Sequence, residues 1–91
     1  MADIALRVRV TGRVQGVWFR GWTQAEASAL GLSGWVRNEA DGSVSALITG
    51  PEDKVAQMVR ALHRGPELAR VAAVESEEVA ERAEGPFRVL R

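Results

Sequence analysis

The sequence predicts an α+β fold in which two helices cover one face of a mostly antiparallel sheet. Three observations support this prediction. Apolar and polar residues alternate with a period of two in several short stretches, which is typical of strands with one buried face. Two longer stretches have helical character. Turn residues separate these stretches in the order strand, helix, strand, strand, helix, strand, strand.

The first predicted strand covers residues 4–11, where every second residue from Ile4 to Val10 is apolar. Residues 12–20 follow as Gly-Arg-Val-Gln-Gly-Val-Trp-Phe-Arg. A glycine-bearing turn between a strand and a helix can present several backbone N–H groups to an anion. Arg20 closes the run with a planar, permanently charged group that suits phosphate or carboxylate. We therefore predict an anion-binding hollow in this loop.

The first predicted helix covers residues 21–31, which are rich in alanine and leucine. It is expected to start between Phe19 and Thr23, because Thr23-Gln-Ala-Glu26 fits a capping box. Gly31 suits the position just past a helix end.

A hairpin is predicted next. Its strands are residues 33–38, with Trp35 and Val36 on opposite faces, and residues 43–49. The Asp-Gly pair at residues 41–42 is a strong signal for the turn between them.

The second predicted helix begins at Pro51, which suits a first helical turn. Apolar residues at positions 55, 58, 59 and 62 have the i, i+3, i+4, i+7 spacing of one helix face. Arg64-Gly-Pro66 ends this helix.

The chain closes with a predicted strand at residues 70–76, an acidic, turn-like segment at 77–85 and a short edge strand at 87–90. The element order is that of a two-layer, ferredoxin-like α/β sandwich, βαββαβ with one extra strand, in a single domain over residues 1–91. In this topology the third strand lies between the first two, which are then parallel. The loop after the first strand is therefore expected beside Asn38, at the end of the second.

The composition excludes several classes of function. The 12 basic and 12 acidic residues leave no net charge, which argues against a broad surface for nucleic acid or anionic membrane. The absence of cysteine and the single histidine, His63, exclude thiol catalysis and metal sites built from several histidines. No apolar run approaches the roughly 18 residues of a membrane span, and Asp3 interrupts any signal pattern. We expect a soluble, cytoplasmic monomer with no cofactor.

Two stretches resemble the acylphosphatase family. Gly12-Arg-Val-Gln-Gly-Val-Trp-Phe-Arg20 is similar to its phosphate-binding signature, and Gly34-Trp-Val-Arg-Asn38 is similar to its second motif. The resemblance covers nearly the whole chain. It implies a small, free-standing enzyme that hydrolyses acyl phosphates, in which Arg20 binds the substrate phosphate and Asn38 holds the attacking water.

The loop backbone is the expected phosphate cradle. The residues assigned to it are Gly12, Arg13, Val14, Gln15, Gly16, Val17 and Trp18. No metal is needed in this chemistry, because the leaving carboxylate has a conjugate-acid pKa of about 4. The loose phosphoryl transition state demands little of the nucleophile, so one arginine, N–H groups and one amide would suffice.

Structural interpretations stay open for single residues. Gly12 and Gly16 fit a plain turn with positive φ, and Asn38 fits a turn former. Gln15 either lines the loop with its side chain or has a structural role. The tryptophans at positions 18, 22 and 35 either flank an acyl-binding surface or only pack.

Two other functions compete with hydrolysis. An RNA-binding module would stack bases on aromatic residues of the sheet, but the predicted exposed face carries Arg7, Arg9 and serines. These arginines are expected to be solvated or paired with acidic neighbours. A regulatory or carbamoyl-phosphate-handling domain would resemble the N-terminal domain of a hydrogenase maturation protein.

The identity of the substrate is also open: acetyl phosphate, a glycolytic acyl phosphate, carbamoyl phosphate and phosphorylated aspartate all fit.

Overall fold

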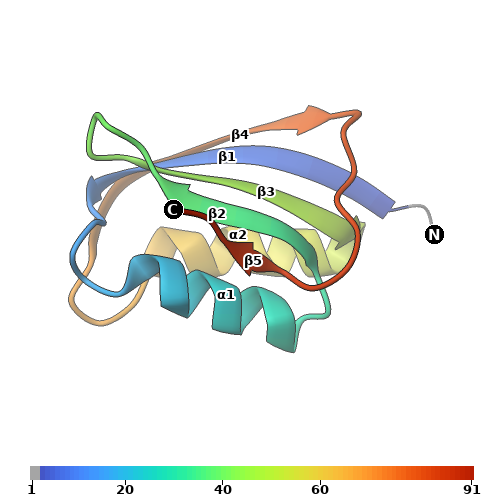
Figure 1. Cartoon of the computed structure of the whole chain (residues 1–91), viewed down its shortest axis with the longest axis horizontal. Coiled ribbons are helices and arrows are strands. Elements are labelled where there is room, and N and C mark those ends of the chain that lie inside the picture. The colour runs from blue at the N-terminus through green and yellow to red at the C-terminus, as the bar shows by residue number, and fades with distance from the viewer. Residues whose placement is uncertain (1–2) are drawn as a thin grey trace.

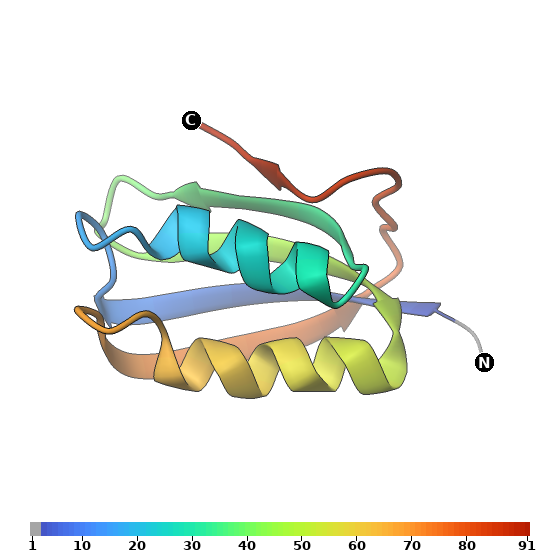
Figure 2. The same ribbon diagram turned by 90° about the horizontal axis from the view of Figure 1, so that it is seen from below.

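The computed structural model describes residues 3–91, and it has the predicted two-layer architecture. The elements are β1 Asp3–Arg13, α1 Phe19–Ala29, β2 Ser33–Asn38, β3 Val44–Pro51, α2 Glu52–Arg64, β4 Arg70–Val79 and β5 Arg88–Val89. Both helices lie on one face of the sheet (Figure 1), where they run side by side (Figure 2). The opposite face carries no helix.

The sheet has the strand order β4-β1-β3-β2-β5. Strand β3 pairs antiparallel with both β1 and β2, so β1 and β2 run parallel, as the topology predicted. The register aligns Val10 of β1 and Asn38 of β2 with the same residue, Val44 of β3. The end of β2 and the chain leaving β1 therefore lie at the same edge of the sheet.

The core lies between the helices and the sheet. The fully buried strand residues in it are Val8, Val10, Val36, Val44, Ala46 and Ile48. Helix α2 adds Val55, Met58 and Leu62, which confirms the predicted apolar face. Burying each large apolar side chain stabilises the fold by about 1.5–3 kcal/mol. This packing holds α1, and with it the loop before α1, against the sheet.

Strand β1 is longer than predicted. Gly12 and Arg13 pair with Val71 and Arg70 of β4 across a register shift, so the loop starts only after Arg13. A side chain at Gly12 would collide with the carbonyl group of Arg70, and the φ of Gly12 is 120°. Glycine is therefore required here by the close approach of two strands.

Strand β4 also runs past its predicted end. Residues 77–79 pair with residues 5–7 of β1 instead of forming a turn. Glu77 lies opposite Arg7, and Val79 lies opposite the buried Ala5. The acidic residues at 77 and 78 therefore lie on an edge strand, where charge discourages pairing with another chain.

The predicted capping box is wrong. Helix α1 begins at Phe19 after a left-handed Trp18 that makes no side-chain cap, and Thr23 is fully buried inside the helix. The C-terminal prediction is confirmed: Gly31 has a φ of 72°. Leu32 donates its N–H to the Ala27 carbonyl oxygen at 2.9 Å, which closes the helix end. Pro51 ends β3 rather than opening α2.

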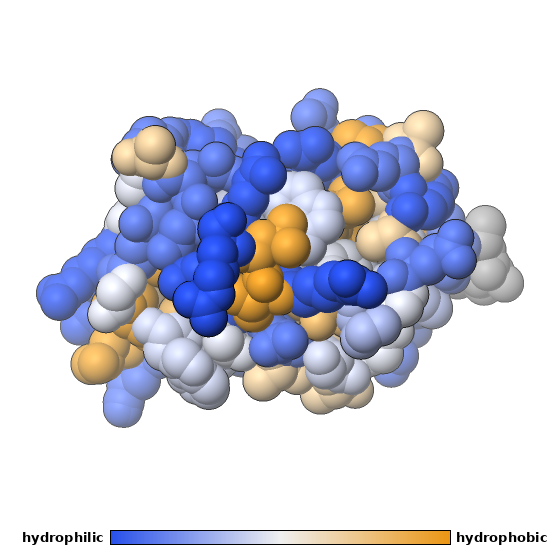
Figure 3. Space-filling view, in the orientation of Figure 1, coloured by the Kyte–Doolittle hydropathy of each residue, from blue (hydrophilic) through white to orange (hydrophobic). Residues whose placement is uncertain are grey.

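The side of the molecule seen in Figure 3 is mainly hydrophilic, with a small apolar patch where β5 runs. Trp35 lies on the helix-free face of the sheet, beside two arginines. The guanidinium groups of Arg7 and Arg37 lie 5.4 and 4.9 Å from the ring centroid of Trp35. This stacking covers the indole, so the face offers no open aromatic platform for bases.

The β2–β3 turn is closed by Asp41. Its Oδ1 accepts hydrogen bonds from the N–H of Ser43 at 2.9 Å and from the Ser43 hydroxyl at 2.6 Å. Arg9 adds an ion pair at 2.6 Å. The bonds from Ser43, together with this arginine, hold the pKa of Asp41 well below its usual range.

We predict that Asp41→Asn lowers stability at neutral pH. A carboxyl whose folded pKa is depressed stabilises the fold above its unfolded pKa, and this contribution declines as the pH falls towards the folded pKa. The variant should therefore have a lower urea midpoint than the wild type at pH 7, and the difference should shrink at about pH 2. Glu67→Gln, at an exposed loop position, is the control. Equal differences at both pH values would contradict the prediction.

Candidate active site

A cavity of about 220 Å³ opens at the sheet edge where β1 and β2 end. It is lined by Val14, Gly16, Trp18, Phe19, Arg20, Gly21, Asn38, Val89 and Arg91. The structure thus brings together Arg20 and Asn38, the two residues predicted to be catalytic. Val89 of β5 and Arg91, which lies just after β5, form one side of this cavity.

The loop over residues 14–18 carries an unusual backbone. Gly16 and Trp18 both have left-handed conformations, with φ values of 75° and 65°. For a residue other than glycine this conformation costs roughly 1–2 kcal/mol. Such strain persists only where the surrounding structure enforces it, and it is concentrated at functional loops.

The amide groups of this loop are free. Within residues 3–91, no hydrogen bond starts from a backbone N–H of residues 14–18. The first N–H groups of α1, from Phe19 onward, also lack a partner within the helix. The N-terminus of α1, which carries the positive end of the helix dipole, directly follows this loop. The arrangement suits a bound anion.

Gln15 fastens the loop to the neighbouring turn. Its Nε2 donates hydrogen bonds to the carbonyl oxygens of Glu39 at 2.8 Å and Ser43 at 2.9 Å. Both acceptors lie in the turn that follows Asn38. Of the two interpretations of Gln15, the structure supports the structural one, because the side chain faces the turn and does not line the cavity.

Arg20 lies on the first turn of α1 and is half-buried. Its Nη1 lies 3.4 Å from the carbonyl oxygen of Leu90. No carboxylate of the described residues lies within ion-pair distance of it. Its positive charge is therefore uncompensated and faces the cavity.

Asn38 is the last residue of β2 and is half-buried. Its Oδ1 is buried and has no hydrogen-bond partner among residues 3–91. A buried polar atom without a partner costs about 1–3 kcal/mol. Such an atom calls for an explanation, and a water or ligand that enters the site is one.

Besides Gln15, three predicted loop residues do not reach the cavity. Gly12 and Arg13 belong to β1, and Val17 is buried in the core at 7% exposure. Conversely, the sequence analysis missed Val89 and Arg91. Nothing in the local pattern marks these two, because their position depends on β5 pairing with β2.

Of the three tryptophans, only Trp18 lines the cavity. Trp22 packs against Phe19 with 5.5 Å between ring centroids. Trp35 lies on the opposite face of the sheet, between two arginines.

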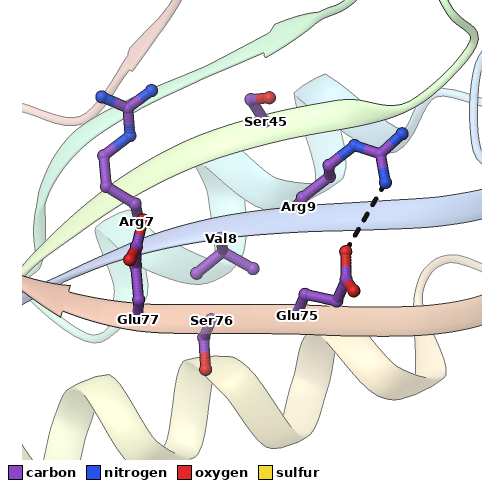
Figure 4. Close-up of a pocket in the computed structure, with 7 residues that line it drawn as sticks. All are labelled: Arg7, Val8, Arg9, Ser45, Glu75, Ser76 and Glu77. Atoms are coloured by element: carbon purple, nitrogen blue, oxygen red, sulfur yellow. Dashed lines mark ion pairs between the residues drawn. The ribbon is translucent and has the colours of Figure 1, made fainter.

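A larger hollow of about 420 Å³ lies on the helix-free face, between β1 and β4 (Figure 4). Its arginines are compensated: Arg9 lies 3.5 Å from Glu75, and Arg7 lies 3.9 Å from Glu81. This confirms that Arg7 and Arg9 pair with acidic neighbours. The hollow therefore lacks the free positive charge of the cavity beside Asn38.

Two further observations concern metal-binding groups and membrane-spanning helices. The described part of the chain contains no group of three or more histidine, aspartate or glutamate side chains placed to hold a metal ion. Within residues 3–91, neither helix is long and apolar enough to cross a membrane.

Comparison with known proteins gives a consistent result. Residues 6–89 match the family model described as Acylphosphatase. The chain is 58% identical over 89 residues to an acylphosphatase of Rhizobium meliloti (strain 1021), covering 96% of this chain and 93% of that protein. The crystal structure of acylphosphatase from Bacillus subtilis has a TM-score of 0.90 at 37% identity, with 97% of this chain and 99% of that one covered. An acylphosphatase from Coxiella burnetii has a TM-score of 0.93 at 35% identity, with coverage of 97% and 93%. By this match and these identities, the chain belongs to the acylphosphatase family.

Proposed function

We propose that this chain is an acylphosphatase that hydrolyses the carboxyl–phosphate bond of acyl phosphates to a carboxylate and inorganic phosphate. One observation carries the proposal. A single cavity is bordered by the uncompensated Arg20, by Val14, Gly16 and Trp18 with their free backbone amides, and by Asn38. Family membership supports the same reaction.

The loop and Arg20 bind the phosphoryl group. Backbone N–H groups at a helix N-terminus donate to phosphate oxygens, and a guanidinium contributes two parallel donors in a fixed plane. These donors are placed before the substrate arrives, so they stabilise charge in the transition state without reorganising. Gln15 contributes indirectly by holding the loop against the turn.

Asn38 orients the nucleophile. A water donates a hydrogen bond to the unpaired Oδ1 and directs its own oxygen at phosphorus, opposite the leaving carboxylate. The new bond joins the water oxygen to phosphorus, and the bond between phosphorus and the acyl oxygen breaks. The proton of the water passes to a phosphate oxygen.

The leaving group needs no assistance. A carboxylate has a conjugate-acid pKa of about 4 and departs as an anion at neutral pH. No general acid and no metal ion is required for that step. The proposed reaction is therefore independent of metal ions.

The proposed reaction can be tested on the wild-type protein. This protein should release phosphate from acetyl phosphate and benzoyl phosphate at the same rate with and without a chelator. Phenyl phosphate should not be hydrolysed, because a phenolate with a conjugate-acid pKa of about 10 leaves poorly without an acid. A phosphate-release assay measures all three. Absence of turnover would refute the proposed function, and loss of turnover in chelator would refute the metal-independent reaction.

Arg20→Lys should lower kcat/KM by about 100-fold or more, because lysine keeps the charge but loses the planar pair of donors. Steady-state kinetics with acetyl phosphate measure the effect. Arg88→Lys, on the exposed side of β5, is the matched control and should stay within about twofold. If Arg20→Lys hydrolysed acetyl phosphate at the wild-type rate, Arg20 would not bind the phosphoryl group as proposed.

Asn38→Ala should lower kcat by about 100-fold, since a misplaced nucleophile costs a factor of this order. Inhibition by inorganic phosphate should change little, because the loop and Arg20 remain. The two measurements separate a role in positioning water from a role in binding phosphate. A kcat within about twofold of the wild type would contradict the proposal.

A further inference from the structure

We propose that the indole of Trp18 is the platform that binds the acyl group, so that the preferred substrates are acyl phosphates with an aromatic or other flat, apolar acyl group. This inference rests on the proposed hydrolysis of acyl phosphates and adds a substrate class to it. It concerns the side chain of Trp18, whereas the phosphate cradle involves only the backbone of this residue.

The exposure of Trp18 is the first observation. The side chain borders the cavity, yet the residue is 68% exposed. Among residues 3–91 only Leu68 is a comparably exposed large hydrophobic residue, and Leu68 does not line the cavity. An indole beside a polar site that leaves most of its surface in water is available to a ligand.

The second observation is that the indole is held in place. Trp18 keeps a left-handed backbone that is unfavourable for tryptophan. A side chain at Gly21 would collide with the Nε1 and ring carbons of Trp18, so the indole lies across the first turn of α1. Glycine weakens a helix relative to alanine, and here it leaves room for the ring. A ring positioned before binding loses little freedom when a ligand stacks on it.

The third observation is the position of the indole relative to the phosphate-binding groups. Trp18, Gly16 and Arg20 border the same cavity. The acyl carbon of the substrate is joined to phosphorus through a single oxygen. When the loop and Arg20 hold the phosphate, the acyl group therefore lies beside the cavity wall. The large apolar members of that wall are Val14, Trp18, Phe19 and Val89, and only Trp18 among them is largely exposed.

The test compares two substrates. Trp18→Asn removes the indole while keeping a residue that tolerates the left-handed backbone, and Trp18→Phe keeps a flat ring. For Trp18→Asn, kcat/KM for benzoyl phosphate should fall about 10-fold, mainly through KM. The value for acetyl phosphate should fall less than about threefold. Trp18→Phe should retain most of the wild-type ratio between the two substrates.

Two controls separate binding of the acyl group from damage to the loop. The inhibition constant of inorganic phosphate should be unchanged in Trp18→Asn, and Leu68→Ser, which removes the other exposed hydrophobic residue, should leave the substrate ratio unchanged. An equal loss for both substrates, or an unchanged ratio, would overturn this inference while the proposed function stands. A wild-type protein that hydrolyses neither substrate would overturn both.

Discussion

The backbone turn between β1 and α1 is the constraint on which the site depends. It leaves consecutive amide groups without internal partners, which is unfavourable unless water or an anion takes them. The left-handed residues Gly16 and Trp18 make the turn possible. The cost is offset by burial of side chains in the turn and just after it, because Val14, Val17 and Phe19 lie in the core at 1%, 7% and 2% exposure. The loop is thus anchored by some of its side chains while the others border the cavity.

Arg20 and Asn38 lie on different elements, α1 and β2, so the loop must also be held beside the end of β2. The sheet aligns the strand ends, and Gln15 then joins the loop directly to the turn after Asn38. Two hydrogen bonds from one amide couple the predicted phosphate cradle to the predicted water-binding residue. A loop and a turn that approached each other without this link would be free to shift, and a shift of about 1 Å is enough to reduce catalysis strongly.

The parts that the sequence predicted correctly depend on local patterns. Alternation, helical spacing and the Asp-Gly turn determine the order of elements, and the order places the loop beside Asn38. The sequence-based predictions are wrong or incomplete at positions whose structure depends on residues far away in the chain. Gly12 continues β1 because Val71 and Arg70 are available to pair with it and its neighbour. Helix α1 starts at Phe19, within the predicted range, but the predicted cap is wrong, because Thr23 is buried inside the helix and no local preference predicts the left-handed Trp18. Arg91 reaches the cavity only because β5 runs parallel to β2.

The distribution of charge explains how a chain without net charge can select an anion. On the helix-free face Arg7, Arg9 and Arg37 lie within 4.0 Å of glutamate or aspartate, so their fields are largely cancelled. Arg20 has no such partner among the described residues, and the N-terminus of α1 adds to its field. At the end of the sheet where Arg20 borders the cavity, this charge and the helix terminus together favour a bound anion. A compact phosphate group matches a field of this extent, because one guanidinium and one helix terminus act on the same small volume.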